Sequence, residues 1–429
     1  MSHTEQKGRA IALLPIVVFL VIFLGSGIIT GDFYAMPAIV AFLIALAVAF
    51  VQNKRLSFDN KIKVISKGVG DENIITMSLI FLCAGAFSGT ISAAGGVEST
   101  VNFFLSILPP SIAIVGLFVI GCFISVSMGT SMGTISALAP IAVGISEKTG
   151  FAMAICIGSV VCGAMFGDNL SMISDTTIAA VKTQGCEMKD KFKANFLIVL
   201  PAAILTITIF LVITSGSVFE VNKSELVYNV WQIIPYLFVL IGALIGINVF
   251  VVLIGGIVFS LIVGLATGTI AAANMFNVIG NGVTGMYDIT VISIVVACIV
   301  SLVKEFGGIQ FILDLIRSKI NSKKGAEFGI AGLALMVDCC TANNTVAIVM
   351  AGPIAKEISD EFGVDPKRSA SLLDIFASVG QGIIPYGAQL LSAATLTGLT
   401  PYAIMPYLFY PALMAISAIL FITFRKEAK

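Results

Sequence analysis

One short segment of the chain, residues 166–177, gathers carboxylate, amide and hydroxyl side chains inside a long apolar stretch. If this segment is helical, Asp168 and Asp175 lie on one face, because residues two turns apart point to the same side of a helix. Burial favours the protonated carboxyl group and a bound cation favours the ionised one, so a buried aspartate holds either a proton or a sodium ion. We therefore predict cation–proton exchange at these two residues. The simpler alternative is that Asp175 only caps a helix start.

Three further polar breaks interrupt apolar parts of the chain, at residues 127–136, 338–345 and 381–389. Unwound carbonyls and hydroxyls suit sodium, and the exposed amides of half-helix N-termini suit an anion. The alternative is that the small residues pack helix against helix. The ligands that we predict from these breaks are Thr130, Ser131, Thr134, Asp338, Thr341, Asn343, Asn344, Thr345 and Gln389, with Asp168, Asp175 and Asp338 as the sodium carboxylates. Asp374 is left open between a structural and a functional role.

The composition requires a membrane setting for these groups. Of the 429 residues 58% are hydrophobic and 11% charged, and mean hydropathy is +1.05. Seven apolar runs approach or exceed the about 17–25 residues that a membrane-spanning helix needs: 10–29, 34–51, 194–213, 228–245, 249–265, 289–303 and 402–424. We predict an all-α integral membrane protein in a lipid bilayer. A net charge of zero gives no case for nucleic acid, and eight scattered Cys with one His argue against disulfides and zinc.

An internal repeat organises the polar breaks. Gly95-Gly96 matches Gly307-Gly308, residues 130–134 match 341–345, and residues 167–177 match 387–397, with an offset that grows along the chain. Three matches in the same order indicate two structural repeats. The predicted domains are a two-helix segment (1–51), a first inverted repeat (52–227), connecting helices (228–266) and a second inverted repeat (267–429).

Basic segments set the predicted orientation. Lys and Arg gather at 54–67, 182–193, 317–324 and 425–429, which the positive-inside rule places in the cytoplasm together with both termini. This placement holds only if residues 111–146 and 328–358 each enter and leave on one face. We therefore predict about ten transmembrane helices plus two re-entrant hairpins, with tips at 129–134 and 341–345. Crossing helices broken midway are the alternative.

Residues 167–177, GDNLSMISDTT, closely resemble the signature GDNLSPISDTT of the NhaC-type sodium/proton antiporters of the ion transporter superfamily. The tip at 129–131, Pro140 and residues 385–387 also resemble that family, and Met172 departs from its usual Pro. The resemblance implies a secondary antiporter of the bacterial inner membrane, whose relatives also exchange malate, lactate or other organic solutes. It makes the leading site candidates Asp168, Asn169, Ser171, Ser174, Asp175 and Thr176.

These observations favour a secondary antiporter that exchanges sodium and protons by alternating access, through rocking or elevator motion, with no cofactor besides these coupling ions. The alternative is a sodium- or proton-coupled exchanger of a small organic anion or amino acid. Gly167-Asp168 and Tyr287-Asp288 resemble the Gly-Asp and Tyr-Asp motifs of intramembrane aspartyl proteases, but they occur in reversed order and Met165 stands where the Gly-x-Gly-Asp form needs Gly. Such a protease is therefore a distant alternative. A passive channel would not need paired carboxylates within broken repeats. We therefore predict no enzyme activity, and the sequence allows a homodimer.

Overall fold

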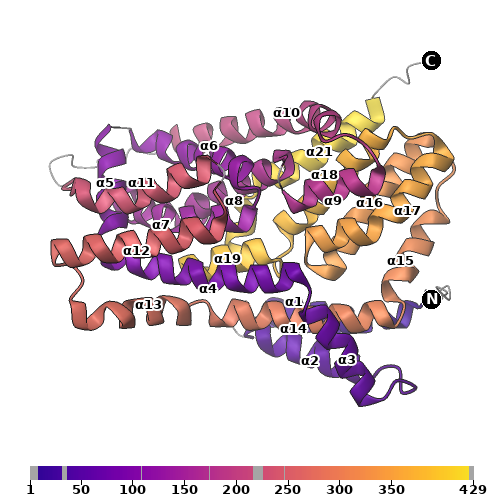
Figure 1. Ribbon diagram of the computed structural model, residues 1–429. Helices are drawn as coiled ribbons and strands as arrows, with labels where there is room; N and C mark the ends of the chain where they lie inside the picture. Colours follow the sequence, from indigo (N-terminus) through magenta and orange to yellow (C-terminus); the bar gives the residue numbers. More distant parts are fainter. Residues whose placement is uncertain are drawn as a thin grey trace.

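The computed structural model describes residues 8–30, 36–107, 109–172, 174–215, 226–245 and 247–424, and every regular element in these ranges is helical (Figure 1). The first half of the chain contains η1 (Ala10–Leu13), α1 (Leu14–Thr30), α2 (Ala38–Val51), α3 (Phe58–Val69), α4 (Glu72–Ala93), α5 (Gly96–Ile107), α6 (Pro110–Met128), α7 (Ser131–Thr149), α8 (Met153–Leu170), α9 (Asp175–Gln184) and α10 (Met188–Ser215). The second contains α11 (Val230–Leu244), α12 (Val249–Thr267), η3 (Ala272–Asn274), α13 (Met275–Thr284), α14 (Tyr287–Glu305), α15 (Gly308–Arg317), α16 (Lys323–Thr341), α17 (Asn344–Phe362), α18 (Pro366–Ile383), α19 (Ala388–Thr397), α20 (Pro401–Ile404), η4 (Met405–Tyr407) and α21 (Phe409–Phe424).

Several helices are long and apolar enough to cross a bilayer. Four qualify among the described residues, and up to seven if each of three bent pairs counts as one span. The bends measure 116° between α5 and α6, 61° between α14 and α15, and 53° between α20–η4 and α21. The chain is thus built for a membrane, whereas ten crossings stay a prediction.

The structure adds detail to two segments that were named from the sequence. The apolar run 402–424 is not one helix, because Pro406 and Pro411 lack the N–H groups that a continuous helix would use near its break. The basic segment 54–67 is largely the amphipathic helix α3 rather than a loop. Its Lys61 is buried and donates to the carbonyls of Phe50 and Gln52 at the end of α2, both at 2.7 Å. The basic residues 425–429 lie outside the described residues.

All four predicted polar breaks interrupt helices in the structure, and they follow one pattern in both halves. The break before α7 and the break before α17 each contain a residue with positive φ, Gly129 at 68° and Ala342 at 49°. Gly129 and Ala342 differ in residue number by a fixed amount. The first and last residues of α7, α8 and α9 differ from those of α17, α18 and α19 by the same amount. Gly150 and Gly363, and likewise Gly185 and Gly398, end corresponding helices in the left-handed conformation.

This constant offset corrects the drifting register predicted from the sequence. Gly167 lies inside α8, whereas Gly387 precedes α19, so the match between residues 167–170 and 387–390 was accidental. The position equivalent to Asp168 is Gln381, and the position equivalent to Ser131 is Asn344. Local similarity of small and polar residues misled the alignment, because such residues recur at every break.

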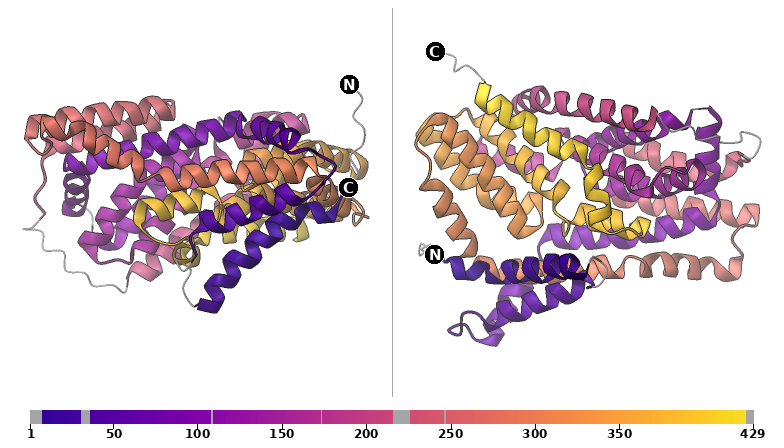
Figure 2. Two further views of the ribbon diagram at one scale, coloured as in Figure 1. Left: turned by 90° about the horizontal axis from the view of Figure 1, so that it is seen from below. Right: turned by 180° about the vertical axis from the view of Figure 1, so that it is seen from behind.

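Each half of the chain packs one short helix against the other half, and the two helices occupy corresponding positions. Helix α9 packs against α17 and α18, and its counterpart α19 packs against α7 and α8. Figure 1 shows α8, α9 and α19 between α7 on the left and α17 on the right, with α4, α12 and α13 side by side along one flank (see also Figure 2). The breaks from both halves therefore converge at the centre.

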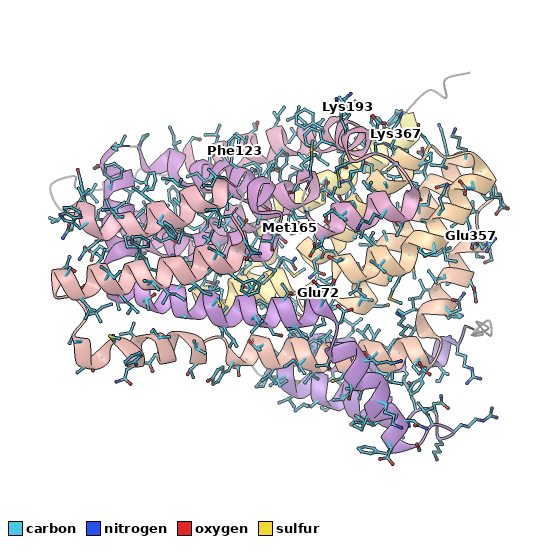
Figure 3. The ribbon with its side chains drawn as sticks, in the orientation of Figure 1. Glu72, Phe123, Met165, Lys193, Glu357 and Lys367 are labelled. Atoms are coloured by element: carbon cyan, nitrogen blue, oxygen red, sulfur yellow. The ribbon has the colours of Figure 1, made fainter. Side chains whose placement is uncertain are left out.

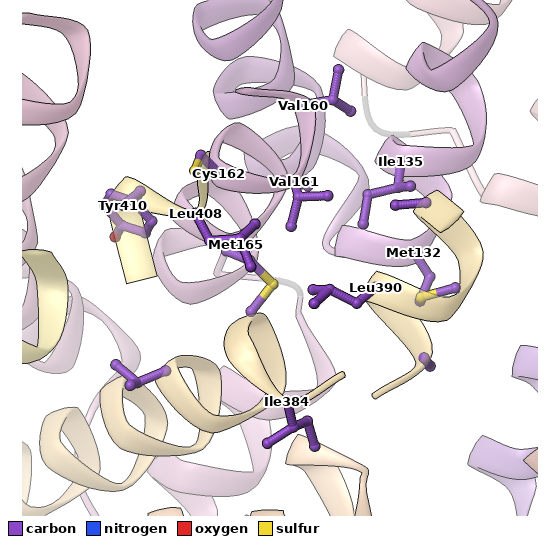
Figure 4. Packing of buried hydrophobic residues seen from close by; sticks show 14 of the residues in the cluster. Met132, Ile135, Val160, Val161, Cys162, Met165, Ile384, Leu390, Leu408 and Tyr410 are labelled. Carbon is purple, nitrogen blue, oxygen red and sulfur yellow. The ribbon is translucent and has the colours of Figure 1, made fainter. Parts of the chain in front are cut away.

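An apolar core holds this central region. Val161 and Met165 of α8 belong to the same buried cluster as Ile135 of α7 and Leu390 of α19 (Figure 4). Charged side chains such as Lys193 and Glu357 are exposed and lie at the periphery, far from Met165 in the interior (Figure 3). The few buried charges therefore need specific partners.

Candidate functional site

Asp168 lies in the last turn of α8 and is only 5% exposed. Its Oδ2 accepts a hydrogen bond from Ser131 Oγ at 2.8 Å, and its Oδ1 accepts one from Ser174 Oγ at 2.6 Å. Ser131 is the first residue of α7, and Ser174 directly precedes α9, where its hydroxyl also lies 2.9 Å from that of Thr176. Two predicted breaks thus meet at one carboxylate.

The second half of the chain contributes two glutamines to the same network. Gln389 Nε2 in α19 donates to Ser131 Oγ at 3.1 Å, and Gln381 Nε2 in α18 donates to Gln389 Oε1 at 2.5 Å. Gln389 was predicted as a ligand from its break. Gln381 was named only as a residue of that break and not as a ligand, although its polar side chain in an apolar stretch could have identified it as one. The hydrogen-bonded chain therefore runs from Asp168 across the contact between the halves.

A cavity with a volume of about 100 Å³ opens beside this network. It exceeds the about 10–15 Å³ that one water needs, so it has room for an ion with part of its hydration shell. The predicted residues that line it are Thr130, Ser131, Asp168, Ser174, Asp175, Thr176, Asn343, Asn344, Thr345 and Gln389. Asp175 is exposed at its rim, in the first turn of α9, where a negative charge is favourable.

Other predicted residues serve the breaks rather than the cavity wall. Thr134 Oγ1 donates to the carbonyl of Thr130 at 2.9 Å, and Ser171 Oγ donates to that of Val126 at 2.7 Å. Thr341 Oγ1 donates to the carbonyl of Asn343 at 3.2 Å. The carbonyl of Val126 lies in the last turn of α6, where the interrupted helix leaves it without its usual N–H donor, whereas those of Thr130 and Asn343 also accept from Thr134 N and Ala347 N.

Asp338 does not line this cavity, although it was predicted as a sodium ligand. It is fully buried in α16, and neither carboxylate oxygen has a hydrogen-bond partner within the described part of the chain. A Cβ atom on Gly380 would lie 2.4 Å from its Oδ2, so glycine is needed there for the helices to approach. Asp338 and Asp168 therefore occupy separate environments.

A buried polar network behind the cavity was missed from the sequence. Lys191 Nζ, 1% exposed, donates to the carbonyl of Asn169 at 2.9 Å, to Thr177 Oγ1 at 3.0 Å and to the carboxylate of Asp374. Asn195 Nδ2 donates to Asn169 Oδ1 at 2.6 Å. This network fixes the free end of α8 against α9, α10 and α18. The sequence analysis placed Lys191 in the basic segment 182–193, and only a helix starting at Met188 would have placed it inside.

A second cavity, with a volume of about 130 Å³, adjoins the first. Asn343 and Ala388 line both. Its walls are mainly apolar, and Lys304 and Asp71 are its charged residues. Tyr386 on this wall donates to the carbonyl of Cys339 at 2.7 Å. Residues at the end of α14, such as Lys304, therefore line a cavity that shares part of its wall with the first.

Two helix N-termini face the first cavity. Thr130 Oγ1 caps α7 by accepting from Gly133 N at 3.3 Å, and Asn343 Oδ1 caps α17 by accepting from Val346 N at 2.9 Å. Their first turns carry partial positive charge. At α7, the carboxylate of Asp168 accepts a hydrogen bond from Ser131, the first residue of the helix, and so places a negative charge beside this N-terminus.

Comparison with known proteins identifies the family of this chain. The model of the Na+/H+ antiporter family matches residues 7–215 and 221–425. The "Malate-2H(+)/Na(+)-lactate antiporter" of Bacillus subtilis is 22% identical, over 93% of this chain and 92% of its own length. The "Na(+)/H(+) antiporter NhaC" of Alkalihalophilus pseudofirmus is 23% identical, over 90% and 89%.

Among solved structures, the YdaH transporter of Alcanivorax borkumensis aligns over 95% of this chain and 97% of its own, with a TM-score of 0.44 and 12% identity. The family match covers nearly the whole chain, including all four breaks. The apolar helices agree with a multi-pass membrane protein. The chain therefore belongs to the Na+/H+ antiporter family.

Proposed function

We propose that Asp168 is the residue at which this antiporter exchanges a sodium ion for a proton. The observation that carries the proposal is the pair of hydroxyl bonds to the Asp168 carboxylate at the wall of a polar cavity between the two halves. Carboxylate and hydroxyl oxygens are hard ligands of the kind that small cations without strong geometric preference accept. When sodium binds, the hydroxyl groups of Ser131 and Ser174 would rotate, so that their oxygens contact the ion instead of their hydrogens contacting the carboxylate.

Competition between the two cations supplies the coupling. A carboxyl group with little exposure binds either a proton or a sodium ion, but it does not carry both easily. Movement of one bundle against the other would then expose Asp168 alternately to each side of the membrane. The reciprocal packing of α9 against the second half and of α19 against the first half supports inverted repeats as the basis of this motion.

The membrane placement is part of the same proposal. The exposed basic residues of α3 and of the turn before it, Lys54, Arg55, Lys63 and Lys67, favour a cytoplasmic location of this end. Both termini would then be cytoplasmic and the bilayer would be the bacterial inner membrane. A homodimer stays a prediction, with lipid or a second copy covering exposed apolar residues such as Leu197 and Val212.

The test is sodium-driven proton movement in proteoliposomes, measured with a trapped pH-sensitive dye. Asp168→Asn keeps the shape and a hydrogen-bonding amide but removes the ionisable group, so it should abolish exchange. In the wild type, the apparent KM for sodium should rise by up to about tenfold for each pH unit of acidification once protons compete for the site, at constant maximal rate.

The control is the thermal unfolding of purified Asp168→Asn, which should match that of the wild type. Exchange by this variant at a rate close to wild type would remove Asp168 from the site. A sodium KM that does not change with pH would refute the shared site.

A further inference from the structure

A cavity with a volume of about 290 Å³ lies on the outer flank of the molecule, where α10, α18 and α21 pack together. Figure 1 shows α10 along the upper edge of the view, with α21 and α18 next to it. The cavity is more than twice as large as either central cavity. It shares no wall residue with the polar cavity around Asp168. The proposed sodium–proton exchange therefore gives it no function.

The back of this cavity is built from contacts within the protein. Arg368, in the first turn of α18, is 3% exposed. Its Nε and one terminal nitrogen donate to the two carboxylate oxygens of Glu327 at 3.3 and 3.4 Å. Its guanidinium carbon lies 4.3 Å from the ring centre of Phe421, a distance at which a cation is attracted to an aromatic ring. These contacts fix the wall, so a ligand meets a preformed site.

Side chains of both charges surround the opening of the cavity. Lys193 and Lys367 are exposed and lie near each other at one edge of the molecule (Figure 3). Asp190 and Asp365 are exposed and line the same cavity. Lys367 Nζ lies 3.2 Å from Asp365 Oδ2, but an ion pair with side chains 46% and 50% exposed contributes little to stability and can rearrange around a ligand. The opening therefore offers two ammonium groups and two carboxylates to one ligand.

An exposed apolar stripe leads from this opening along α10. Leu197 lines the cavity, and Ile204 and Leu211 follow it at intervals of two helical turns on the same side of the helix. Ile416 and Leu420 are exposed on the neighbouring helix α21. In the proposed orientation the basic segment 182–193 places this end of α10 at the cytoplasmic face. A ligand with a charged head and long apolar chains fits this combination.

We propose that the cavity binds the headgroup of phosphatidylethanolamine from the cytoplasmic leaflet, with the acyl chains along α10 and α21. The phosphate would accept from Lys193 and Lys367, and the primary ammonium would donate to Asp190 and Asp365. Pockets with basic residues between transmembrane helices bind phospholipid headgroups at this side of a membrane. Phosphatidylglycerol has no cation for the two carboxylates, and the trimethylated nitrogen of phosphatidylcholine has no N–H group to donate.

The bound lipid would hold the starts of α10 and α18 together, and a ligand that binds only the folded protein stabilises it. The first experiment therefore follows thermal unfolding of the purified, delipidated full chain in a nonionic detergent. Phosphatidylethanolamine, phosphatidylglycerol or phosphatidylcholine with identical acyl chains is added. Phosphatidylethanolamine should reach half of its maximal stabilisation at a concentration at least about threefold lower than either of the others. Native mass spectrometry of the same mixtures should show it as the lipid that remains bound.

Two double variants separate the contacts of the headgroup. Asp190→Asn/Asp365→Asn removes both carboxylates, while Asn preserves the N-cap of α18, where Asp365 Oδ1 accepts from Lys367 N at 3.1 Å. This variant should lose the preference for phosphatidylethanolamine over phosphatidylglycerol. Lys193→Gln/Lys367→Gln should weaken the binding of phosphatidylethanolamine at least about fivefold, because it removes the charged partners of the phosphate.

The matched control is Lys356→Gln/Asp360→Asn, which removes an ion pair on the surface of α17 and should keep the wild-type lipid preference. Equal stabilisation of the wild type by the three lipids, or a preference for another of them, overturns the inference. An unchanged preference for phosphatidylethanolamine in both cavity variants also overturns it, because the lipid would then bind elsewhere. If a double variant does not fold, the single variants Asp190→Asn and Lys193→Gln, both at exposed positions, give the same comparison. Lipid binding is measured without transport, so neither result affects the sodium site proposed at Asp168.

Discussion

Removal of the Lys191 ammonium should destabilise the protein more than removal of the whole ion pair. Lys191 and the Asp374 carboxylate are 1% and 0% exposed, and they contact each other directly. Lys191→Met leaves the Asp374 charge buried, and breaking a buried pair in this way costs about 3–5 kcal/mol. In the double variant Lys191→Met/Asp374→Leu no charge is left. Asn195 still donates to the Asn169 carbonyl, at 2.9 Å, so the cost falls to that of one unsatisfied group, about 1–3 kcal/mol.

The size of this difference separates two views of the network. If Lys191 acts only through neutral-strength hydrogen bonds, each is worth about 0.6 kcal/mol in a membrane protein, and its three bonds total about 2 kcal/mol. The double variant would then be no more stable than the single one. If the buried charge dominates, the double variant recovers about 2 kcal/mol relative to Lys191→Met.

The assay is equilibrium unfolding of the purified protein in mixed micelles with increasing sodium dodecyl sulfate, followed by circular dichroism. The matched control is Lys193→Met, which lies near Lys191 in α10 but is exposed (Figure 3). It should change the free energy of unfolding by less than about 0.5 kcal/mol. A double variant that is as unstable as Lys191→Met, or less stable, would refute the role assigned to the buried charge.

Two further predictions concern the carboxylates. Gly380→Ala should destabilise the protein by about 1–3 kcal/mol in the same unfolding assay, because its Cβ would lie 2.4 Å from Asp338 Oδ2. Gly332→Ala on α16 meets nothing within 4 Å and should be close to neutral; equal effects of the two would disprove the close contact. Asp175→Asn should raise the sodium KM by no more than about fivefold in the proteoliposome assay, because an exposed charge contributes about 0–1 kcal/mol. Complete loss of exchange, as expected for Asp168→Asn, would place Asp175 at the centre of the site instead of its rim.

The sequence was informative about the breaks because polar groups in apolar surroundings are costly and therefore conspicuous. The helices end and restart at all four predicted places, and ten of the predicted ligands line one cavity. The position of Asp168 between Ser131 and Ser174 was not predicted, because it depends on two breaks of the first half meeting in space. Local composition is sufficient for such features because each break carries its own signal.

Contacts between distant segments could not be predicted in the same way. Lys191 looked like any lysine of a basic loop, and only the packing of α10 against α18 and α9 makes it a buried partner of Asp374. The register of the repeats failed for a related reason. Small residues satisfy every break, so their letters match at several offsets, whereas the helix ends and left-handed positions of α7–α9 and α17–α19 match at one.

The corrected register also explains why the two halves cannot substitute for each other chemically. Asp168 corresponds to neutral Gln381, while Asp338 corresponds to Ser125, whose hydroxyl donates to the carbonyl of Ala164 at 2.6 Å. The carboxylates of the two halves therefore occupy different positions in the shared helix pattern. Of the two, only Asp168 lines the cavity and has hydroxyl donors. If sodium binds at Asp168 as proposed, Asp338 is not placed to take over that binding when Asp168 is replaced, and we predict that the two halves share a single cation site.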